Sequence, residues 1–439
     1  MNDYKFGEYI YELRTCAGLS QIELAKKLGV SDKAVSKWEN GKAKPQVDML
    51  KKLAIVFGVS VEALLDTSDE ITEKQITKIV ITGGPCAGKT TGMSWIQNAF
   101  TEMGYSVIFI PETATELISG GVAPWTLNTN FDYQICQMKL QMEKEKIFEE
   151  AASKMFNSDK VLIVCDRGTI DNKAYMTDGE FKSALLKLNV NETELRDSYD
   201  AVFHLVTAAK GAEEFYTLSN NQARTETIEE AAAMDDKLIS AWTGHPHFRV
   251  IDNAKGFEEK MKHLISEMSS FLGEPEPYEI ERKFLIEYPD IEALEKNPNS
   301  KKVEIIQTYL KADNGDEIRV RQRGENGNYI YFKTIKKRVD DIKRIEIENR
   351  LTKDEYLTLL MDADTSKKQI RKTRYCLTYE SQYFEIDIYP FWSDKAIVEI
   401  ELNDENNQIV FPSFLKVIKE VTDDNNYKNS SLAKNIGVI

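Results

Sequence analysis

Charged and aliphatic residues alternate along several segments in the C-terminal part of this 439-residue chain. The pattern occupies five segments: 279–283, 317–323, 344–348, 385–387 and 398–401. Side chains two positions apart in a strand lie on the same face of a sheet, so each segment would direct its charges to one face. In a closed sheet that face would line a lumen, where carboxylates hold divalent cations while Arg and Lys hold a polyphosphate. A solvated sheet face is the alternative for any single segment, but five in one region favour the lumen.

A second chemical motif lies at residues 83–90, Gly-Gly-Pro-Cys-Ala-Gly-Lys-Thr, which match the pattern G-x-x-x-x-G-K-[ST]. It follows an apolar strand at 79–81 and precedes a helical stretch, which is the context that this phosphate-binding loop requires. Backbone N–H groups would surround a β-phosphate, Lys89 would reach the β- and γ-phosphates, and Thr90 would bind Mg²⁺. The sequence therefore predicts an ATP site formed by Gly83, Gly84, Pro85, Cys86, Ala87, Gly88, Lys89, Thr90 and Thr91.

Four further residues are candidates for catalysis at this ATP site. Asp166 and Arg167 follow a buried parallel strand, and α/β sheets bind ligands at the carboxyl ends of such strands. Asp166 suits a Mg²⁺-water ligand or a general base, and Arg167 suits a phosphate. Glu112 also ends a strand and could hold or deprotonate an acceptor hydroxyl, although a solvated loop acid explains it equally well. Arg224, in a polar helical stretch, could close as a lid on the transferred phosphoryl group; a surface arginine is the alternative.

The stretch from 76 to 272 resembles nucleoside- and nucleotide-kinase-like P-loop proteins, including the kinase half of nicotinamide riboside kinases. Residues 242–246 and 250–253 carry the resemblance beyond the loop. It implies a parallel-sheet α/β domain that binds ATP, with 250–253 near the adenine, and a phosphorylated small molecule or nucleotide as a second partner. His245 and His247 lack a partner at ligand spacing, so we interpret both as structural or surface residues.

The N-terminal residues predict a bundle of short helices. Ser20 is a suitable N-cap for a helix at 21–28, with Glu23 at the capping-box position. A glycine ends that helix, and Ser31 caps a second one at 32–39. Two short helices around a tight glycine turn are typical of a helix-turn-helix.

This N-terminal region resembles the Cro/C1-type (XRE) DNA-binding family along its whole length, including 35–41 and Pro45. Residues 26–52 carry eight lysines against three acidic residues, a local positive charge that suits double-stranded DNA. The resemblance implies a possible homodimer on DNA in which Gln21 contacts the phosphate backbone and the major groove faces Lys33, Ala34, Ser36 and Lys37. A helical protein–protein module is the alternative. We expect the core of the bundle to contain Leu24, Ala25, Val35, Trp38, Leu50 and Leu53.

The C-terminal stretch from 278 to 439 resembles the CYTH domain, the triphosphate tunnel metalloenzyme family. Its E-x-E-x-K signature stands as Glu279, Glu281 and Lys283, and the segment 421–433 also resembles the end of that family's domain. The resemblance implies an antiparallel β tunnel that holds Mg²⁺ or Mn²⁺ through Glu279, Glu281, Glu399 and Glu401. Phosphates would be held by Lys283, Arg319, Arg321, Lys333, Arg344 and Arg374, with Glu281 and Lys283 also taking part in catalysis. Glu348 and Asp387 are weaker candidates, since either could balance a lumen cation.

Composition and linkers complete the prediction of a multidomain protein. Acidic and Pro-containing connectors at 66–70 and 273–277 separate an all-α helix-turn-helix bundle (1–66), an α/β P-loop domain (76–272) and an antiparallel β tunnel (278–439). The net charge of −15 argues against non-specific nucleic-acid binding by the whole chain. Five cysteines without a C-x-x-C pair indicate reduced thiols. Without an apolar signal region or a long apolar run, we expect a cytoplasmic protein with no membrane partner.

Together these features predict a cytoplasmic DNA-binding protein that is also a phosphotransferase or phosphohydrolase, using ATP and Mg²⁺ or Mn²⁺. Two alternatives stay open from the sequence. One is a transcription regulator whose two phosphate-binding domains sense nucleotides without significant turnover. The other is an adenylate cyclase, since the CYTH family includes such enzymes. Fold alone does not decide among them.

Overall fold

The computed structural model describes residues 3–57, 64, 75–155, 159–215, 227–253, 256–274, 280–312, 317–338, 344–402 and 408–435. The chain divides into two compact units. The first comprises Met1–Ile76 and Glu149–Val161, and the second comprises Thr77–Phe148 and Leu162–Ile439. The described N-terminal helices belong to the first unit. The second unit contains almost all of an α/β domain and the whole of a large antiparallel sheet.

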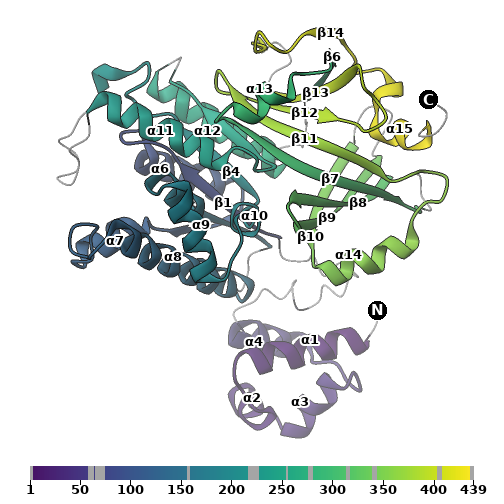
Figure 1. The fold of residues 1–439 in the computed structure, drawn as a ribbon. Coiled ribbons are helices and arrows are strands. Elements are labelled where there is room, and N and C mark those ends of the chain that lie inside the picture. The colour runs from purple at the N-terminus through teal and green to yellow at the C-terminus, as the bar shows by residue number, and fades with distance from the viewer. Residues whose placement is uncertain are drawn as a thin grey trace. The chain divides into compact units, whose positions relative to one another are not determined.

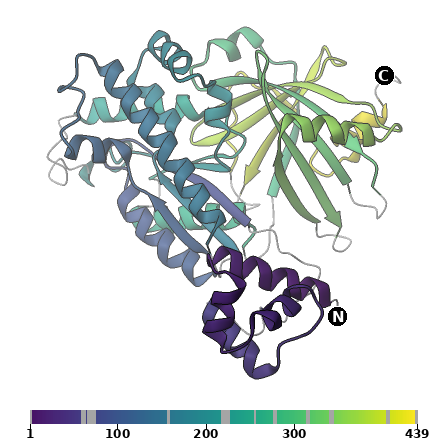
Figure 2. The same cartoon turned by 90° about the horizontal axis from the view of Figure 1, so that it is seen from below.

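Within residues 3–57, four helices form the N-terminal bundle (Figure 2): α1 (Asp3–Cys16), α2 (Gln21–Leu28), α3 (Asp32–Glu39) and α4 (Val47–Phe57). The helix starts are those that the sequence predicts, since Ser20 and Glu23 form a complete capping box and the Ser31 hydroxyl accepts a hydrogen bond from the N–H of Ala34. Gly29 ends α2 in the left-handed conformation at φ 72°. The six predicted core residues of the bundle are all buried.

A five-stranded sheet with helices on both faces follows (Figure 1), and we call it the P-loop domain. Its strand order is β2-β3-β1-β4-β5, and β4 pairs in parallel with both β1 and β5. Its elements are β1 (Gln75–Thr82), α6 (Lys89–Glu102), β2 (Ser106–Ile110), α7 (Thr113–Ser119), α8 (Asn130–Ser153), β3 (Lys160–Asp166), η1 (Thr169–Tyr175), α9 (Asp178–Leu188), α10 (Glu192–Arg196), β4 (Ala201–Leu205), η2 (Glu213–Phe215), α11 (Ile228–Trp242), β5 (Phe248–Ile251) and α12 (Phe257–Leu272). Because both of its faces are covered, the strands read as continuous apolar runs.

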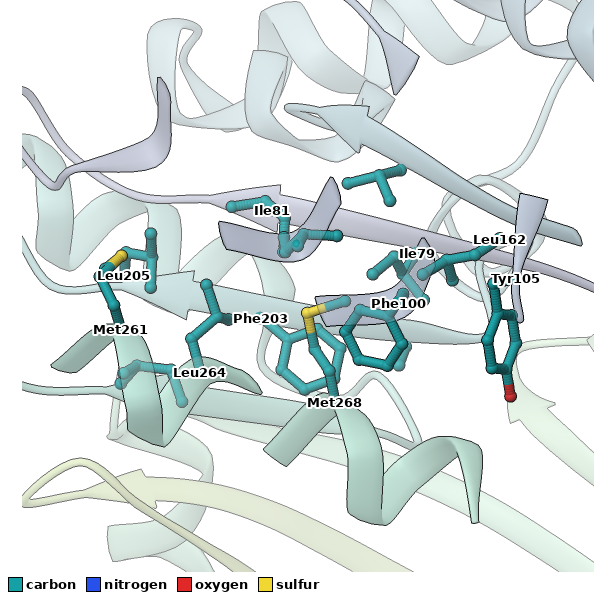
Figure 3. Packing of buried hydrophobic residues seen from close by; sticks show 14 of the residues in the cluster. Ile79, Ile81, Phe100, Tyr105, Leu162, Phe203, Leu205, Met261, Leu264 and Met268 are labelled. Carbon is teal, nitrogen blue, oxygen red and sulfur yellow. The ribbon is translucent and has the colours of Figure 1, made fainter. Parts of the chain in front are cut away.

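One face of this sheet packs against α6 and α12 (Figure 3). Ile81 and Phe203 of the strands lie against Phe100 of α6 and against Met261 and Leu264 of α12, and all five are fully buried. Large-to-small changes at such positions typically cost about 2–5 kcal/mol because they leave a cavity. This core fixes β1 against α6, and the loop between them is the predicted phosphate-binding loop.

The remaining strands form a nine-stranded sheet in the order β10-β9-β8-β7-β11-β12-β13-β6-β14 (Figure 1). Its elements are β6 (Ile280–Glu287), α13 (Ile291–Lys296), β7 (Ser300–Leu310), β8 (Glu317–Glu325), β9 (Asn328–Arg338), β10 (Arg344–Leu351), α14 (Lys353–Leu359), η3 (Leu360–Asp362), β11 (Ile370–Tyr379), β12 (Gln382–Ile388), β13 (Lys395–Leu402), β14 (Val417–Glu420), η4 (Asn425–Tyr427) and α15 (Asn429–Asn435). Each pairing between neighbouring strands is antiparallel. The strands that the charge alternation predicts are therefore all present.

Strand register places the alternating charges on one face of this sheet. Glu281 is paired with Glu401, Lys283 with Glu399, and Arg374 with Asp387. The sheet curves around this face, because Leu285 of β6 and Tyr309 of β7 belong to one buried cluster although three strands lie between them in the sheet order. We call this the lumen face. In order from β6 to β10, it includes Glu281, Lys283, Leu285, Glu399, Glu401, Tyr383, Glu385, Asp387, Lys372, Arg374, Thr378, Lys301, Tyr309, Arg319, Arg321, Arg323, Phe332, Thr334, Lys336, Glu348 and Arg350.

Three chemical features of the described residues bear on the sequence analysis. None of the described helices is both long and apolar enough to cross a membrane. Within the described ranges, no group of three or more His, Cys, Asp and Glu side chains could hold a metal ion. Cys86, Cys136, Cys165 and Cys376 are not joined in disulfides.

Candidate functional sites

The loop at 83–90 turns sharply between β1 and α6. Gly83, Cys86 and Gly88 have φ values of 147°, 55° and 89°, a region that costs energy for residues with a Cβ. A Cβ on Gly83 would lie 2.1 Å from the carbonyl oxygen of Leu205, so no larger residue fits there unless β4 moves. Lys89 is buried at the start of α6, and its Nζ donates a hydrogen bond to the Gly83 carbonyl oxygen at 3.3 Å. The ammonium group therefore lies inside the loop, where a phosphate would meet it.

A buried carboxylate behind the loop holds its backbone in place. Asp235 of α11 accepts hydrogen bonds from the N–H groups of Gly84 at 2.9 Å and Thr207 at 3.1 Å, and it pairs with Lys210 at 3.1 Å. Burial disfavours the charged carboxylate, but His204, Lys210 and the N–H donors together lower the pKa of Asp235. The sequence analysis missed this residue, since nothing near the motif indicates a partner so distant along the chain.

Charged side chains gather near Lys89 at the carboxyl ends of β2 and β3: Glu112, Asp166, Arg167 and Asp171. Arg167 donates from Nε to Glu112 at 2.5 Å, and its Nη1 lies 3.5 Å from Asp171. Asp171 also accepts the hydroxyl of Thr82 at 2.8 Å and the indole N–H of Trp242. Arg167 has a φ of 70°, a conformation that costs about 1–3 kcal/mol and is common at functional sites.

Burial and neighbouring charges shift the protonation of this cluster. Burial and the charge of Arg167 lower the pKa of Lys89 to about 8. Burial opposes ionisation of Glu112, but the charges of Arg167 and Lys89 outweigh it and lower its pKa to about 2. Glu112 is thus suited to holding Arg167 and is a weak proton acceptor. Burial raises the pKa of Asp166, and its Oδ1 is buried without a hydrogen-bond partner. An oxygen of this kind fits a Mg²⁺-bound water.

The structure thus brings together four of the predicted residues, Lys89, Glu112, Asp166 and Arg167, at one site. Thr90 and Thr91 are exposed on the first turn of α6. Arg224 lies outside the described residues. Asp171 was missed, although its position four residues after Arg167 in a strand-end motif was an available signal. His245 is structural: it is fully buried, its Nε2 hydrogen-bonds the Tyr199 carbonyl oxygen at 3.0 Å, and burial lowers its pKa to about 3.

On the lumen face, ion pairs link β6, β13, β12 and β11. Lys283 of β6 contacts Glu399 of β13 at 2.7 Å and Glu281 at 3.4 Å. Arg374 of β11 contacts the same Glu399 at 2.7 Å and Asp387 of β12 at 2.7 Å. The carboxylates of β13 and β12 therefore lie between a cation of β6 and a cation of β11. This is the arrangement that phosphates and divalent cations together require.

These ion pairs, which we call the ladder, determine the protonation of its buried groups. Burial disfavours the ionised Glu399, but Lys283, Lys372 and Arg374 hold its pKa well below the usual range. Burial opposes the charge of Lys283, but Glu399 and Glu281 raise its pKa. Lys372 differs, because burial and the adjacent Arg374 lower its pKa even though Asp387 contacts it. The sequence analysis missed Lys372.

A second group of cations lies on β8. Arg321 contacts Glu348 of β10 at 2.8 Å, and its guanidinium lies over the Phe332 ring, 5.2 Å from the centroid. Burial and the nearby Arg319 lower the pKa of Arg321, although the negative charge of Glu348 opposes this shift. Its buried Nε has no hydrogen-bond partner, so a donor remains for an anion in the lumen. Glu348 also accepts the Thr334 hydroxyl at 2.9 Å, and its ion pair with Arg321 fits its predicted charge-balancing role.

Three predicted lumen residues have a different outcome. The prediction that Lys333 lines the lumen is wrong, because Lys333 pairs with Val320 and therefore lies on the face opposite to Arg319. Lys336 has the lumen-facing register instead. Glu279 lies outside the described residues. Arg344 begins β10, but its side chain is also outside the described part.

The carboxylates present fit a hard divalent cation. Glu281 and Glu401 are directly opposite each other on β6 and β13, and their register places both on the lumen face. Carboxylate oxygens on adjacent strands are a suitable donor set for Mg²⁺ or Mn²⁺. Glu399 is held by two cations, Lys283 and Arg374, and its side chain is only 7% exposed. Glu401 contacts Arg249 of β5, but its side chain and that of Glu281 are more accessible, at 29% and 40% exposed. Glu281 and Glu401 are therefore the better candidates among the described acids.

The predicted DNA-contact residues of the N-terminal bundle differ in their exposure and contacts. Lys33 and Lys37 are exposed on α3, while Ala34 and Ser36 are half-buried. Gln21, at the start of α2, donates to Glu39 at 2.7 Å. The sequence predicts DNA contacts for all five, and their roles stay predictions.

Comparison with known protein families identifies the three parts of the chain. A helix-turn-helix profile matches residues 10–64, an AAA domain profile matches 78–260, and a CYTH domain profile matches 277–434. The HTH-type transcriptional activator BcrR of Enterococcus faecalis is 41% identical over 68 residues, which are 16% of this chain and 33% of that protein. The chain thus spans only a third of the length of that relative.

The curated relatives of the C-terminal region are matched over nearly their whole length. An inorganic triphosphatase of Acetivibrio thermocellus is 31% identical over 158 residues, 36% of this chain and 94% of that protein. One of Nitrosomonas europaea is 33% identical over 162 residues, 36% of this chain and 98% of that protein. A solved structure of an inorganic triphosphatase is 29% identical, covers 36% of this chain and 95% of its own, and has a TM-score of 0.26. The chain therefore belongs to the CYTH family and carries a helix-turn-helix domain and an AAA-type P-loop domain ahead of its CYTH domain.

Proposed function

We propose that this protein hydrolyses a triphosphate on the CYTH lumen face with Mg²⁺ or Mn²⁺. The proposal divides the chain into a DNA-binding domain (1–66), an ATP-binding domain (76–272) and this hydrolase (278–439). The observation that carries it is the ladder of buried cations and carboxylates from β6 to β11. Sheets that merely face solvent do not bury ions in this way, because each buried charge is costly.

The chain's own residues would bind and orient the substrate. Arg319 and Arg321 suit the phosphate oxygens through forked hydrogen bonds, whereas Lys283 and Arg374, whose donors pair with carboxylates, suit them as positive charges. Glu281 and Glu401 would hold the divalent cation. When bound, that cation neutralises phosphate charge and polarises a phosphorus–oxygen bond. Carboxylates hold Arg374 and Arg321 in place before substrate arrives, so that little ordering of these two side chains remains to be done on binding.

The test is phosphate release from inorganic tripolyphosphate, ATP and GTP with Mg²⁺ or Mn²⁺, measured in a Lys89→Ala background to suppress turnover at the P-loop. We expect EDTA to abolish activity and Glu281→Gln to reduce it by at least about 100-fold, because the amide keeps the shape but loses the charge that binds the metal. Arg282→Gln is the matched control, since Arg282 pairs with the exposed Glu420 at 2.6 Å away from the lumen face. Wild-type activity in Glu281→Gln would show that the lumen is not the active site.

A second activity is supported by the P-loop site. We propose that it binds ATP and transfers its γ-phosphoryl group, because Lys89, Arg167 and Asp166 lie together at the strand ends where such sites form. ATP consumption that depends on an added phosphorylated small molecule or nucleotide would support transfer. ATP binding without consumption would favour the sensing alternative, and release of cyclic AMP would favour the cyclase.

A further inference from the structure

The P-loop domain contacts the lumen face at one end of the nine-stranded sheet. Six lumen-face residues on six strands take part: Lys301, Arg323, Arg350, Thr378, Tyr383 and Glu401. Each lies within a few residues of the end of its strand. In an antiparallel sheet with this order, those strand ends all belong to the same end of the lumen face. The P-loop domain therefore covers that end.

The contact is buried and specific. Arg323 is 1% exposed, and its Nη1 lies 2.8 Å from Asp197 of the P-loop domain, which also pairs with Arg196 at 2.6 Å. Tyr383 donates its hydroxyl to the His245 carbonyl oxygen at 2.7 Å. A triad of buried charges requires good geometry to persist, because its desolvation is costly. The two domains therefore have a fixed relationship at this junction.

One residue of the P-loop domain reaches a predicted metal ligand across this junction. Arg249 of β5 forms an ion pair with Glu401 through Nη2, and its Nε lies 3.5 Å from Glu267 of α12. Glu401 is the cross-strand neighbour of Glu281, so a guanidinium of one domain occupies half of the carboxylate pair that fits a divalent cation. The Arg249 side chain is 21% exposed, so it is neither locked in the core nor fully screened by water.

We propose that Arg249 belongs to the triphosphate site and competes with the divalent cation for Glu401, so that the P-loop domain sets the metal affinity of the CYTH lumen. The inference rests on the proposed function, since it takes Glu281 and Glu401 as the metal ligands. A guanidinium and a hard cation need the same carboxylate lone pairs, so each weakens the binding of the other. Glu267 gives Arg249 a second carboxylate to pair with when Glu401 turns to the cation.

The test is Mn²⁺ binding to the full chain without nucleotide, measured through the EPR signal of the Mn²⁺ that stays free. The Mn²⁺ bound in the lumen is the difference between the Mn²⁺ bound by each protein and that bound by the same protein carrying Glu281→Gln. We expect Arg249→Ala to tighten Mn²⁺ binding about fivefold, the factor expected for loss of a partly exposed ion pair. Glu267→Gln should weaken it about twofold, because Arg249 then has only Glu401. Arg282→Ala, on the exposed pair, should leave it unchanged.

A double-mutant cycle decides whether the effect passes through Glu401. In a Glu401→Gln background, Arg249→Ala should no longer change Mn²⁺ binding. Unchanged affinity in Arg249→Ala, or an effect that persists with Glu401→Gln, overturns the inference. If Arg249→Ala fails to fold, the opposite shift in Glu267→Gln decides, and no shift there overturns it as well. A wild-type chain that neither binds Mn²⁺ in the lumen nor hydrolyses tripolyphosphate would instead reject the proposed function itself.

Discussion

Arg323→Ala should destabilise the second compact unit by breaking the buried junction between its two domains. Asp197 is buried, which disfavours its charge, yet Arg196 and Arg323 lower its pKa from 3.8 to about 2. At 1.36 kcal/mol per unit, that net shift corresponds to about 2.5 kcal/mol, to which Arg196 contributes more than Arg323. Arg323 also donates to the Gly244 carbonyl oxygen, which loses this donor in the variant. We therefore expect a loss of about 3 kcal/mol in unfolding free energy, near the lower end for a broken buried ion pair because Arg196 remains.

The assay is differential scanning calorimetry of the full chain at pH 7 and at pH 3. A loss of this size lowers Tm by about 6–10 °C at pH 7. Because the folded pKa of Asp197 lies below its unfolded value, its contribution is present above pH 3.8 and is lost as the pH falls toward 2. The difference between wild type and variant should therefore shrink at pH 3. Arg282→Ala, which removes an exposed pair, should shift Tm by less than about 2 °C. Equal shifts in both variants, or no shift in Arg323→Ala, would refute the reasoning.

Two further predictions concern the other sites. Lys89→Ala should abolish ATP binding, measured by isothermal titration, and leave tripolyphosphate hydrolysis intact, because the Lys89 ammonium supplies the point charge that meets the β- and γ-phosphates inside the loop; wild-type ATP affinity would contradict the P-loop assignment. Residues 1–66 should select a specific duplex from genomic fragments, and Lys33→Ala with Lys37→Ala should weaken binding at least about tenfold and flatten its salt dependence, because fewer counterions are released. Failure to enrich any sequence would contradict the specific-operator hypothesis.

Local chemistry explains the features that could be predicted from the sequence. Ser20 and Glu23 specify the start of α2 because a capping box involves only residues three apart. The phosphate-binding loop depends on glycines and a lysine within eight positions, so it was recognisable without tertiary information. The alternation in β8, β12 and β13 identifies one charged face because the period of a strand is two. Motif, cap and strand were all encoded within a few consecutive residues.

Tertiary structure decided which face and which partner each side chain has. Lys333 and Lys336 lie in a stretch of β9 where polar and apolar residues do not alternate cleanly, so only pairing with β8 shows that Lys336 has the lumen register. Asp235, distant along the chain, holds the loop through Gly84, and Arg249 reaches Glu401 from another domain. Such contacts arise from the packing of whole elements. Sequence therefore determines which groups can do chemistry, and the fold determines which of them meet.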